Sequence, residues 1–171
     1  YASMDETAVR RRICRKHGLD SEGRVVSFYP FPSQDLLSPY NRFIAPRTEA
    51  VLTALAGTRC QVIIKLHPAE RNLDVYKKWA ERGRKGFRTV VLQKEDPMLL
   101  TKASDLLIAH ESTIAVDGFA MGKPVVFYPL LPETAFSNNS VSEFAKFGVF
   151  HMSPDEKTLR ELAAGAAGAA R

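Results

Sequence analysis

Short apolar runs alternate along this chain with segments in which apolar residues recur at helical spacing. The runs are rich in β-branched and aromatic residues and are ended by turn residues, so each predicts a buried β-strand. A sixth, shorter strand is expected close to residue 150. The predicted strands cover residues 24–29, 60–66, 88–92, 104–109, 124–128 and 149–152.

Helices are predicted between these strands. Asp96 followed by Pro97 is a typical helix start, with the carboxylate as N-cap and proline at the first helical position. Gly122 is expected to close another helix. A polar loop at 132–142 precedes a further short helix, and the Ala/Gly-rich tail at 163–171 is expected to be frayed. The main predicted helices cover residues 8–17, 44–55, 73–82, 97–103, 113–121 and a segment from about 154.

The order of these elements predicts the fold class. Strands and helices alternate, and the strands are continuously apolar, as expected when helices cover both faces of a parallel sheet. We therefore predict a doubly wound α/β fold with a mostly parallel, Rossmann-like sheet. A chain of 171 residues is expected to form one domain. Ligands of such folds bind beyond the carboxyl ends of the strands, where the strand order reverses.

Charge and cysteine content narrow the expected partners and location. The chain has 24 Lys and Arg against 19 Asp and Glu, a net charge of +5, which favours anionic partners, including an anionic membrane surface. Ordinary solvated helix faces would account for the same charges. The basic segments lack interleaved aromatic residues, so nucleic acid is not an expected partner. Cys14 and Cys60 form no CxxC pair, which favours reduced thiols and a cytoplasmic location, peripheral at the inner membrane face.

Polar residues follow the predicted strand at 104–109. Ser112 and Thr113 stand at a strand-to-helix junction, where hydroxyls and unpaired first-turn N–H groups suit a phosphate. Asp117 lies one helical turn further on, in reach of a ribose diol. The alternative is structural: Ser112 as an N-cap and Asp117 as a first-turn carboxylate. His110 and Glu111 precede them on the same rim and are weaker candidates for substrate binding.

A second polar motif, His67-Pro68, follows the predicted strand at 60–66. Pro68 keeps His67 extended, so its imidazole would project from the strand end and could donate to a phosphate oxygen, although a structural histidine is an equal alternative. No HExxH or HxxxH pair is present, so no metal is expected. The chain also lacks a Walker loop, GxGxxG and GxSxG, which argues against triphosphate hydrolysis, dinucleotide cofactors and serine hydrolysis. No cofactor is expected.

The segments KLHPAE (65–70) and SDLLIAHESTIAVDGFAMGKPVVFY (104–128), with RVVSFYPF (24–31), resemble the C-terminal nucleotide-binding domain of GT-B glycosyltransferases. The nearest resemblance is to CDP-glycerol glycerophosphotransferases and capsule-type sialyl and Kdo transferases. It implies that His67, Ser112 and Thr113 contact the phosphates of a nucleotide-activated sugar or polyol phosphate. The resemblance places a ribose-binding carboxylate at Asp117, ahead of Gly122.

The resemblance also implies that the chain is the donor half of a two-domain enzyme of cell-surface polysaccharide synthesis. A preceding GT-B domain would supply the catalytic base, so the chain alone is expected to be inactive. Where glycerophosphotransferases have Asp-Tyr-Ser-Ser, this chain has HEST at 110–113. A UDP-GlcNAc 2-epimerase-like domain is a lower-ranked alternative, because the Asp-Ser-Gly-Gly stretch of those enzymes is absent. A non-catalytic α/β interaction module is another.

Overall fold

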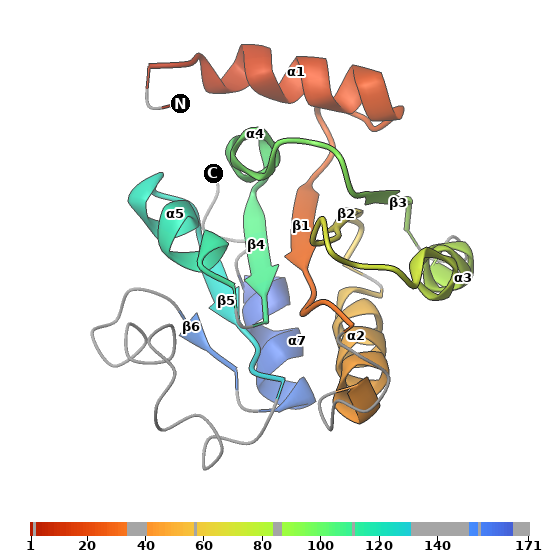
Figure 1. Ribbon diagram of the computed structural model, residues 1–171. Helices are drawn as coiled ribbons and strands as arrows, with labels where there is room; N and C mark the ends of the chain where they lie inside the picture. The colour runs from red at the N-terminus through yellow and green to blue at the C-terminus, as the bar shows by residue number, and fades with distance from the viewer. Residues whose placement is uncertain are drawn as a thin grey trace.

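The computed structural model describes residues 1, 3–33, 41–56, 58–83, 87–110, 112–130, 151–153 and 155–165 (Figure 1). The described helices are α1 (Glu6–His17), α2 (Asn41–Leu55), α3 (Leu73–Gly83), α4 (Pro97–Ala103), α5 (Ile114–Ala120) and α7 (Glu156–Gly165). The described strands are β1 (Val25–Tyr29), β2 (Gln61–Lys65), β3 (Thr89–Leu92), β4 (Leu106–Ala109), β5 (Val125–Phe127) and β6 (His151–Met152).

The strands form one sheet in the order β3-β2-β1-β4-β5-β6, and every described pairing is parallel. The chain builds β2 and β3 on one side of β1 and then crosses back to place β4 on the other side. The strand order therefore reverses between β1 and β4. This confirms the predicted doubly wound parallel sheet and locates its switch point.

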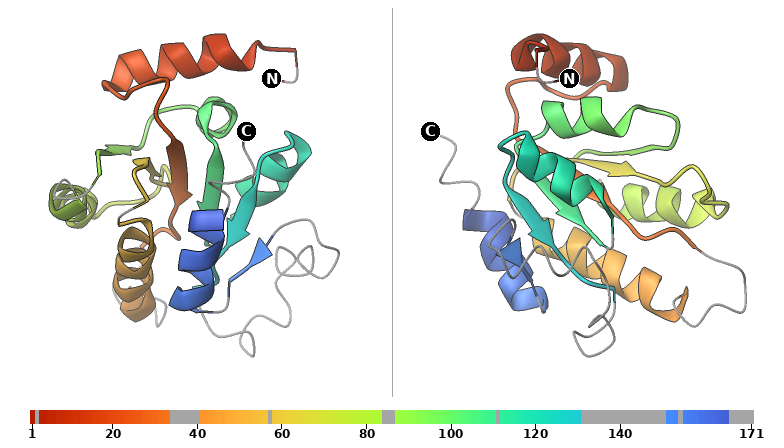
Figure 2. Two further views of the ribbon diagram at one scale, coloured as in Figure 1. Left: turned by 180° about the vertical axis from the view of Figure 1, so that it is seen from behind. Right: turned by 60° about the vertical axis from the view of Figure 1, so that its left-hand side comes forward.

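Helices cover both faces of the sheet, which explains the continuously apolar strands. Along each strand, alternate side chains point to opposite faces. Phe28 and Ile108 pack in the cluster with α2, α3 and α7, whereas Tyr29 and Ala109 pack against α5. On that second face, α1 lies outside α4, far from α2 and α7 (Figure 2). Whether a residue has an odd or an even position in its strand therefore determines which helix layer it packs against.

Local signals in the sequence account for several element ends. Asp96 caps α4 as predicted, accepting hydrogen bonds from the backbone N–H groups of Met98 at 2.8 Å and Leu99 at 3.4 Å. Gly122 follows α5 with a φ of 71°, a left-handed conformation that favours glycine. Gly118 allows α5 to approach the sheet, because an added Cβ would lie 2.1 Å from Leu107 Cδ1.

Some boundaries differ from the predictions. Helix α2 begins at Asn41 rather than 44, and α7 continues to Gly165. The expectation of a frayed tail from 163 was wrong for its first residues, because Ala163 is fully buried in the core beside α2. The predicted loop at 132–142, the short helix after it and residues 166–171 lie outside the described residues. Among the described residues, no helix is long and apolar enough to cross a membrane.

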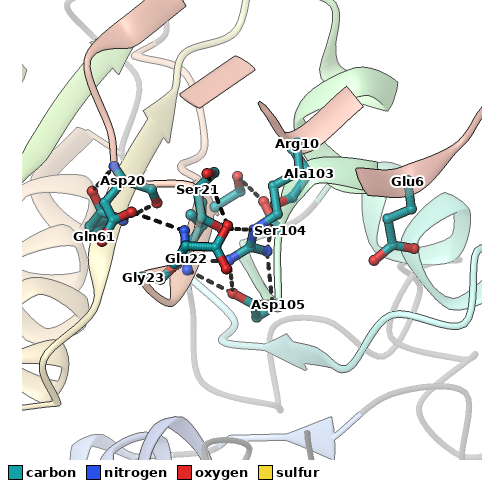
Figure 3. A network of polar contacts seen from close by, with 12 residues as sticks. Glu6, Arg10, Asp20, Ser21, Glu22, Gly23, Gln61, Ala103, Ser104 and Asp105 are labelled. Atoms are coloured by element: carbon teal, nitrogen blue, oxygen red, sulfur yellow. Dashed lines mark hydrogen bonds and ion pairs between the residues drawn. The ribbon is translucent and has the colours of Figure 1, made fainter. Parts of the chain in front are cut away.

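An ion-pair network fastens α1 to the amino ends of β1 and β4 (Figure 3). The Arg10 guanidinium donates to both carboxylate oxygens of Asp105, each at 2.9 Å. It also donates to the backbone oxygens of Ser21 and Gly23 at 2.7 Å and of Ala103 at 3.1 Å. Asp105 in turn accepts the backbone N–H of the first β1 residue at 2.8 Å. The five donors of the Arg10 guanidinium are therefore all used within this network.

Candidate functional site

A pocket of about 340 Å³ opens at the carboxyl ends of β2, β1 and β4, at the switch point of the sheet. Four residues predicted from two separate motifs line it together: His67, Ser112, Thr113 and Asp117. The floor comes from the end of β1, and α4 supplies an apolar wall. The remaining described lining residues are Tyr29, Pro30, Pro32, Lys65, Leu66, Pro68, Pro97, Met98 and Ile114.

The His67 imidazole is exposed at the end of β2 and has a defined hydrogen-bonding state. Its Nδ1 accepts a hydrogen bond from the backbone N–H of Ala69 at 3.1 Å. The neutral ring therefore carries its proton on Nε2. Among the described residues, Nε2 has no partner, so it is available as a donor to a ligand in the pocket.

Gln93, which follows β3, fixes the backbone of the His67-Pro68 turn. Its side-chain amide donates to the carbonyl oxygens of His67 and Pro68 at 3.2 Å and to that of Glu70 at 2.8 Å. The Glu70 backbone N–H closes the turn on the His67 carbonyl at 3.0 Å. This turn is therefore held by side-chain and backbone contacts before any ligand binds.

Glu70 connects that turn to the loop after β1. Its carboxylate accepts the backbone N–H and the hydroxyl of Ser33 at 2.7 and 2.9 Å, and the backbone N–H of Asn72 at 2.7 Å. Burial acts to raise the pKa of Glu70, but hydrogen bonds from Ser33 and Asn72 outweigh it and hold that pKa below its usual value. The ionised carboxylate thus positions the loop that carries Pro32.

Ser112 and Thr113 lie on the opposite wall, between β4 and α5. The structure makes Thr113, rather than Ser112, the N-cap of α5, and its hydroxyl makes no capping hydrogen bond. Among the contacts of the described residues, the Ser112 hydroxyl accepts one long hydrogen bond, 3.4 Å, from the backbone N–H of Ile114. Among the described residues, both hydroxyls are therefore weakly committed to the helix and can donate into the pocket.

Asp117 projects into the same pocket one turn along α5. Its carboxylate has no hydrogen-bond partner among the described residues. Gly118, beside it, lets α5 press close against β4 and so fixes the height of this carboxylate above the strand ends. The arrangement offers an acceptor for hydroxyl groups near the hydroxyls of Ser112 and Thr113.

The structure does not bring His110 into the pocket. His110 is fully buried, its Nδ1 accepts the Phe31 backbone N–H at 3.1 Å, and its ring meets Phe28 edge-on at 5.1 Å. Burial, with the nearby charge of Arg47, lowers the pKa of His110 to about 3. Like Ile108, two positions earlier, His110 points to the face of the sheet that α2 covers. The pocket lies on the opposite face, to which Tyr29 points. Glu111 lies outside the described residues.

Two polar residues of this region escaped the sequence-based reasoning, Lys65 and Glu70. Lys65 had a recognisable signal: a lysine inside the buried apolar run CQVIIKL, one strand period before His67 and hence on the same face. Glu70 had none, because its role depends on Ser33 from a distant loop. Among the described residues, no group of His, Cys, Asp and Glu side chains is placed to hold a metal ion.

The solved structures that are similar to this chain include the following three. MurG of Acinetobacter baumannii has a TM-score of 0.54 at 14% identity, over 99% of this chain and 50% of that one. Escherichia coli ADP-heptose lps heptosyltransferase II has a TM-score of 0.53 at 15% identity, over 71% of this chain and 37% of that one. Thermosulfurimonas dismutans KpsC, a beta Kdo 2,4 transferase, has a TM-score of 0.50 at 16% identity, over 95% and 54%.

This chain therefore spans 37% to 54% of the length of those proteins. No family model and no curated protein matches the sequence. The likeness to the solved structures is one of fold, and it agrees with the doubly wound parallel sheet. The chain has a GT-B glycosyltransferase-like α/β fold.

Proposed function

We propose that this chain is the donor-binding half of a GT-B glycosyltransferase or glycerophosphotransferase that acts in cell-surface polysaccharide synthesis. One observation carries the proposal: four residues assigned to nucleotide binding from two distant motifs line a single pocket at the switch point. The donor is a nucleotide-activated sugar or polyol phosphate. Its phosphate accepts hydrogen bonds from His67 Nε2 and from the hydroxyls of Ser112 and Thr113, and its ribose hydroxyls donate to Asp117.

The pocket groups stabilise the charge that develops when the nucleotide departs. In sugar transfer, the acceptor oxygen forms a bond to the anomeric carbon while the carbon–oxygen bond to the phosphate breaks. The nucleotide leaves with the electron pair, and donors already aimed at its phosphate lower the barrier electrostatically. His67 is the residue proposed to touch that leaving phosphate. No covalent intermediate with the protein is needed.

The proton of the acceptor hydroxyl needs a base within hydrogen-bond reach. His67 and Asp117 are assigned to the donor, so we place the base in a second α/β domain that precedes this half in the active enzyme. The second wall of the cleft would orient the acceptor, a contribution worth about 7–11 kcal/mol in favourable cases. The isolated chain should therefore bind nucleotide weakly, with a Kd of roughly 1 mM, and transfer nothing.

A titration of the isolated chain with CMP, CDP, UMP, UDP, GDP and ADP tests this function. The double variant Ser112→Ala/Thr113→Ala should weaken nucleoside diphosphate binding by about 2–4 kcal/mol, because charge-assisted hydrogen bonds are lost. The control Ser3→Ala/Thr7→Ala removes two exposed hydroxyls near the start of α1 and should bind like the wild type. If no nucleotide saturates the wild type, the chain is a non-catalytic module. Undiminished affinity in a folded double variant rules out these hydroxyls.

A further inference from the structure

Lys65 is a buried lysine at the carboxyl end of β2, and its side chain lines the switch-point pocket. Only 6% of the residue is exposed. His67, two positions further on and beyond the end of β2, lines the same pocket. A lysine so deep in an otherwise apolar strand is uncommon unless a partner or ligand balances its charge.

The hydrogen bonds of the Lys65 ammonium leave one donor over. Nζ donates to the carbonyl oxygens of Leu66 at 2.7 Å and Gln93 at 3.0 Å. An ammonium has three N–H donors, and the third has no acceptor among the described residues. The two carbonyls hold the amine in place at the pocket wall, but they are neutral and do not cancel its charge.

The charges around the pocket are unevenly distributed. Among its described lining residues, Lys65 carries the ammonium group and Asp117 the carboxylate, and they come from opposite walls. Burial lowers the pKa of Lys65, while the charges of Asp96 and Glu95 oppose that shift without a hydrogen bond to the amine. An anion bound beside Nζ would stabilise the ammonium charge, as water does in the unfolded chain.

We propose that Lys65 is a phosphate-binding residue of this pocket, which places its ammonium group on the β2 wall beside the imidazole of His67. This inference rests on the proposed donor site and adds to it the cation that stabilises the departing nucleotide. The phosphate is held between Lys65 and His67 on one wall and the hydroxyls of Ser112 and Thr113 on the other. The ribose then lies toward Asp117, away from the ammonium.

The competing role for Lys65 is structural, as a clamp on the two carbonyl oxygens. The roles differ in which measurements they affect. A clamp alters the unfolding free energy and weakens phosphorylated and unphosphorylated ligands alike. A phosphate contact weakens only ligands that carry phosphate, and the loss shrinks as salt screens the charge.

The test measures pyrophosphate and the tightest nucleotide of the panel by calorimetry, with the matching nucleoside followed by NMR. Lys65→Met should weaken pyrophosphate and nucleotide binding about 10- to 100-fold, the usual effect of losing a charge-assisted contact. Nucleoside affinity should stay within about twofold. Lys65→Arg keeps the charge and should bind more tightly than Lys65→Met. The control Lys94→Met makes the same charge change at a nearby exposed position and should bind like the wild type.

Equal losses for nucleoside and nucleotide, or unchanged pyrophosphate affinity in folded Lys65→Met, would overturn the proposal. If neither variant folds, the ε-carbon NMR signal of Lys65 in the wild type decides, because bound pyrophosphate must shift it and an unmoved signal excludes the contact. Pyrophosphate binding that depends on Lys65, without binding of any nucleotide, keeps the phosphate contact and removes the donor function. Nucleotide binding that is unchanged in Lys65→Met keeps the donor function and removes the phosphate contact of Lys65.

Discussion

The two ends of the same parallel sheet treat their polar groups in opposite ways. At the amino ends, Arg10 uses its guanidinium donors on Asp105 and three backbone carbonyls, so charges and hydrogen bonds close on themselves. At the carboxyl ends, His67 Nε2, the hydroxyl of Thr113 and the carboxylate of Asp117 face a pocket without partners among the described residues. The first end stabilises the fold, and the second is available for a ligand.

This difference gives a physical criterion for separating structural from functional polar residues. A buried polar group that is fully hydrogen-bonded contributes to the folded state alone. A group held in place by some hydrogen bonds but with spare donors or acceptors at a pocket is already arranged for binding. Lys65 meets the second description, and Arg10, which is also a basic residue, meets the first. Substitutions at the two ends should therefore affect different measurements.

The largest effect is expected from Arg10→Met. Removing Arg10 from this partly buried ion pair leaves Asp105 and three carbonyls without their donor. The loss should lower the free energy of unfolding by about 3 kcal/mol. The side chains of Arg10 and Asp105 keep 17% and 27% of their exposure, which holds the cost below that of a fully buried pair. Urea unfolding measures it, and nucleotide affinity of the folded variant should not change.

Arg11→Met is the control for this prediction, because Arg11 is exposed on the same helix. Its unfolding free energy should stay within about 0.5 kcal/mol of the wild type. A similar loss in both variants would mean that general charge, rather than the closed network, stabilises the amino end.

Gly118→Ala should lower both stability and nucleotide affinity. Overpacking should reduce the free energy of unfolding by about 1–3 kcal/mol. The added Cβ would lie 2.1 Å from Leu107 Cδ1 and 3.1 Å from Val125 Cγ2, so α5 must move away from the sheet. Since α5 carries Asp117, nucleotide affinity should fall together with the melting temperature. Gly165→Ala, with nothing within 4 Å of the added Cβ, should change neither. Unchanged affinity in a destabilised Gly118→Ala would show that the site tolerates movement of α5.

A smaller loss of stability is expected at acidic pH. The pKa of His110 is lowered by burial and by Arg47 to about 3 in the folded protein, below its ordinary value. The unfolded chain therefore binds the proton first, and stability is complete above the unfolded pKa and declines as pH falls toward the folded one. Between pH 7 and 5.5 the loss should be about 1 kcal/mol. His110→Phe should lack this component, and an identical pH dependence in both proteins would contradict it.

The sequence predicted what local chemistry and strand order determine. Asp96 and Pro97 predicted the start of α4. Polar residues at two strand ends predicted a shared rim, because parallel strands end on one edge of the sheet. His110 was placed on that rim as well, although the parity of its position turns it to the other face. Glu70 could not be predicted, because its partner Ser33 comes from a loop that only tertiary packing brings near.

Amide NMR of the ¹⁵N-labelled wild-type chain, titrated with CMP, CDP, UMP, UDP, GDP and ADP in turn, tests most directly that the carboxyl end of the sheet is the binding end. We predict saturable shifts for at least one nucleotide, concentrated at residues 65–67 and 112–117. The amides at 21–24 and 103–105, in the Arg10 network, should not move. Shifts centred on those amino-end residues, or no saturable shift with any of these nucleotides, would contradict the account.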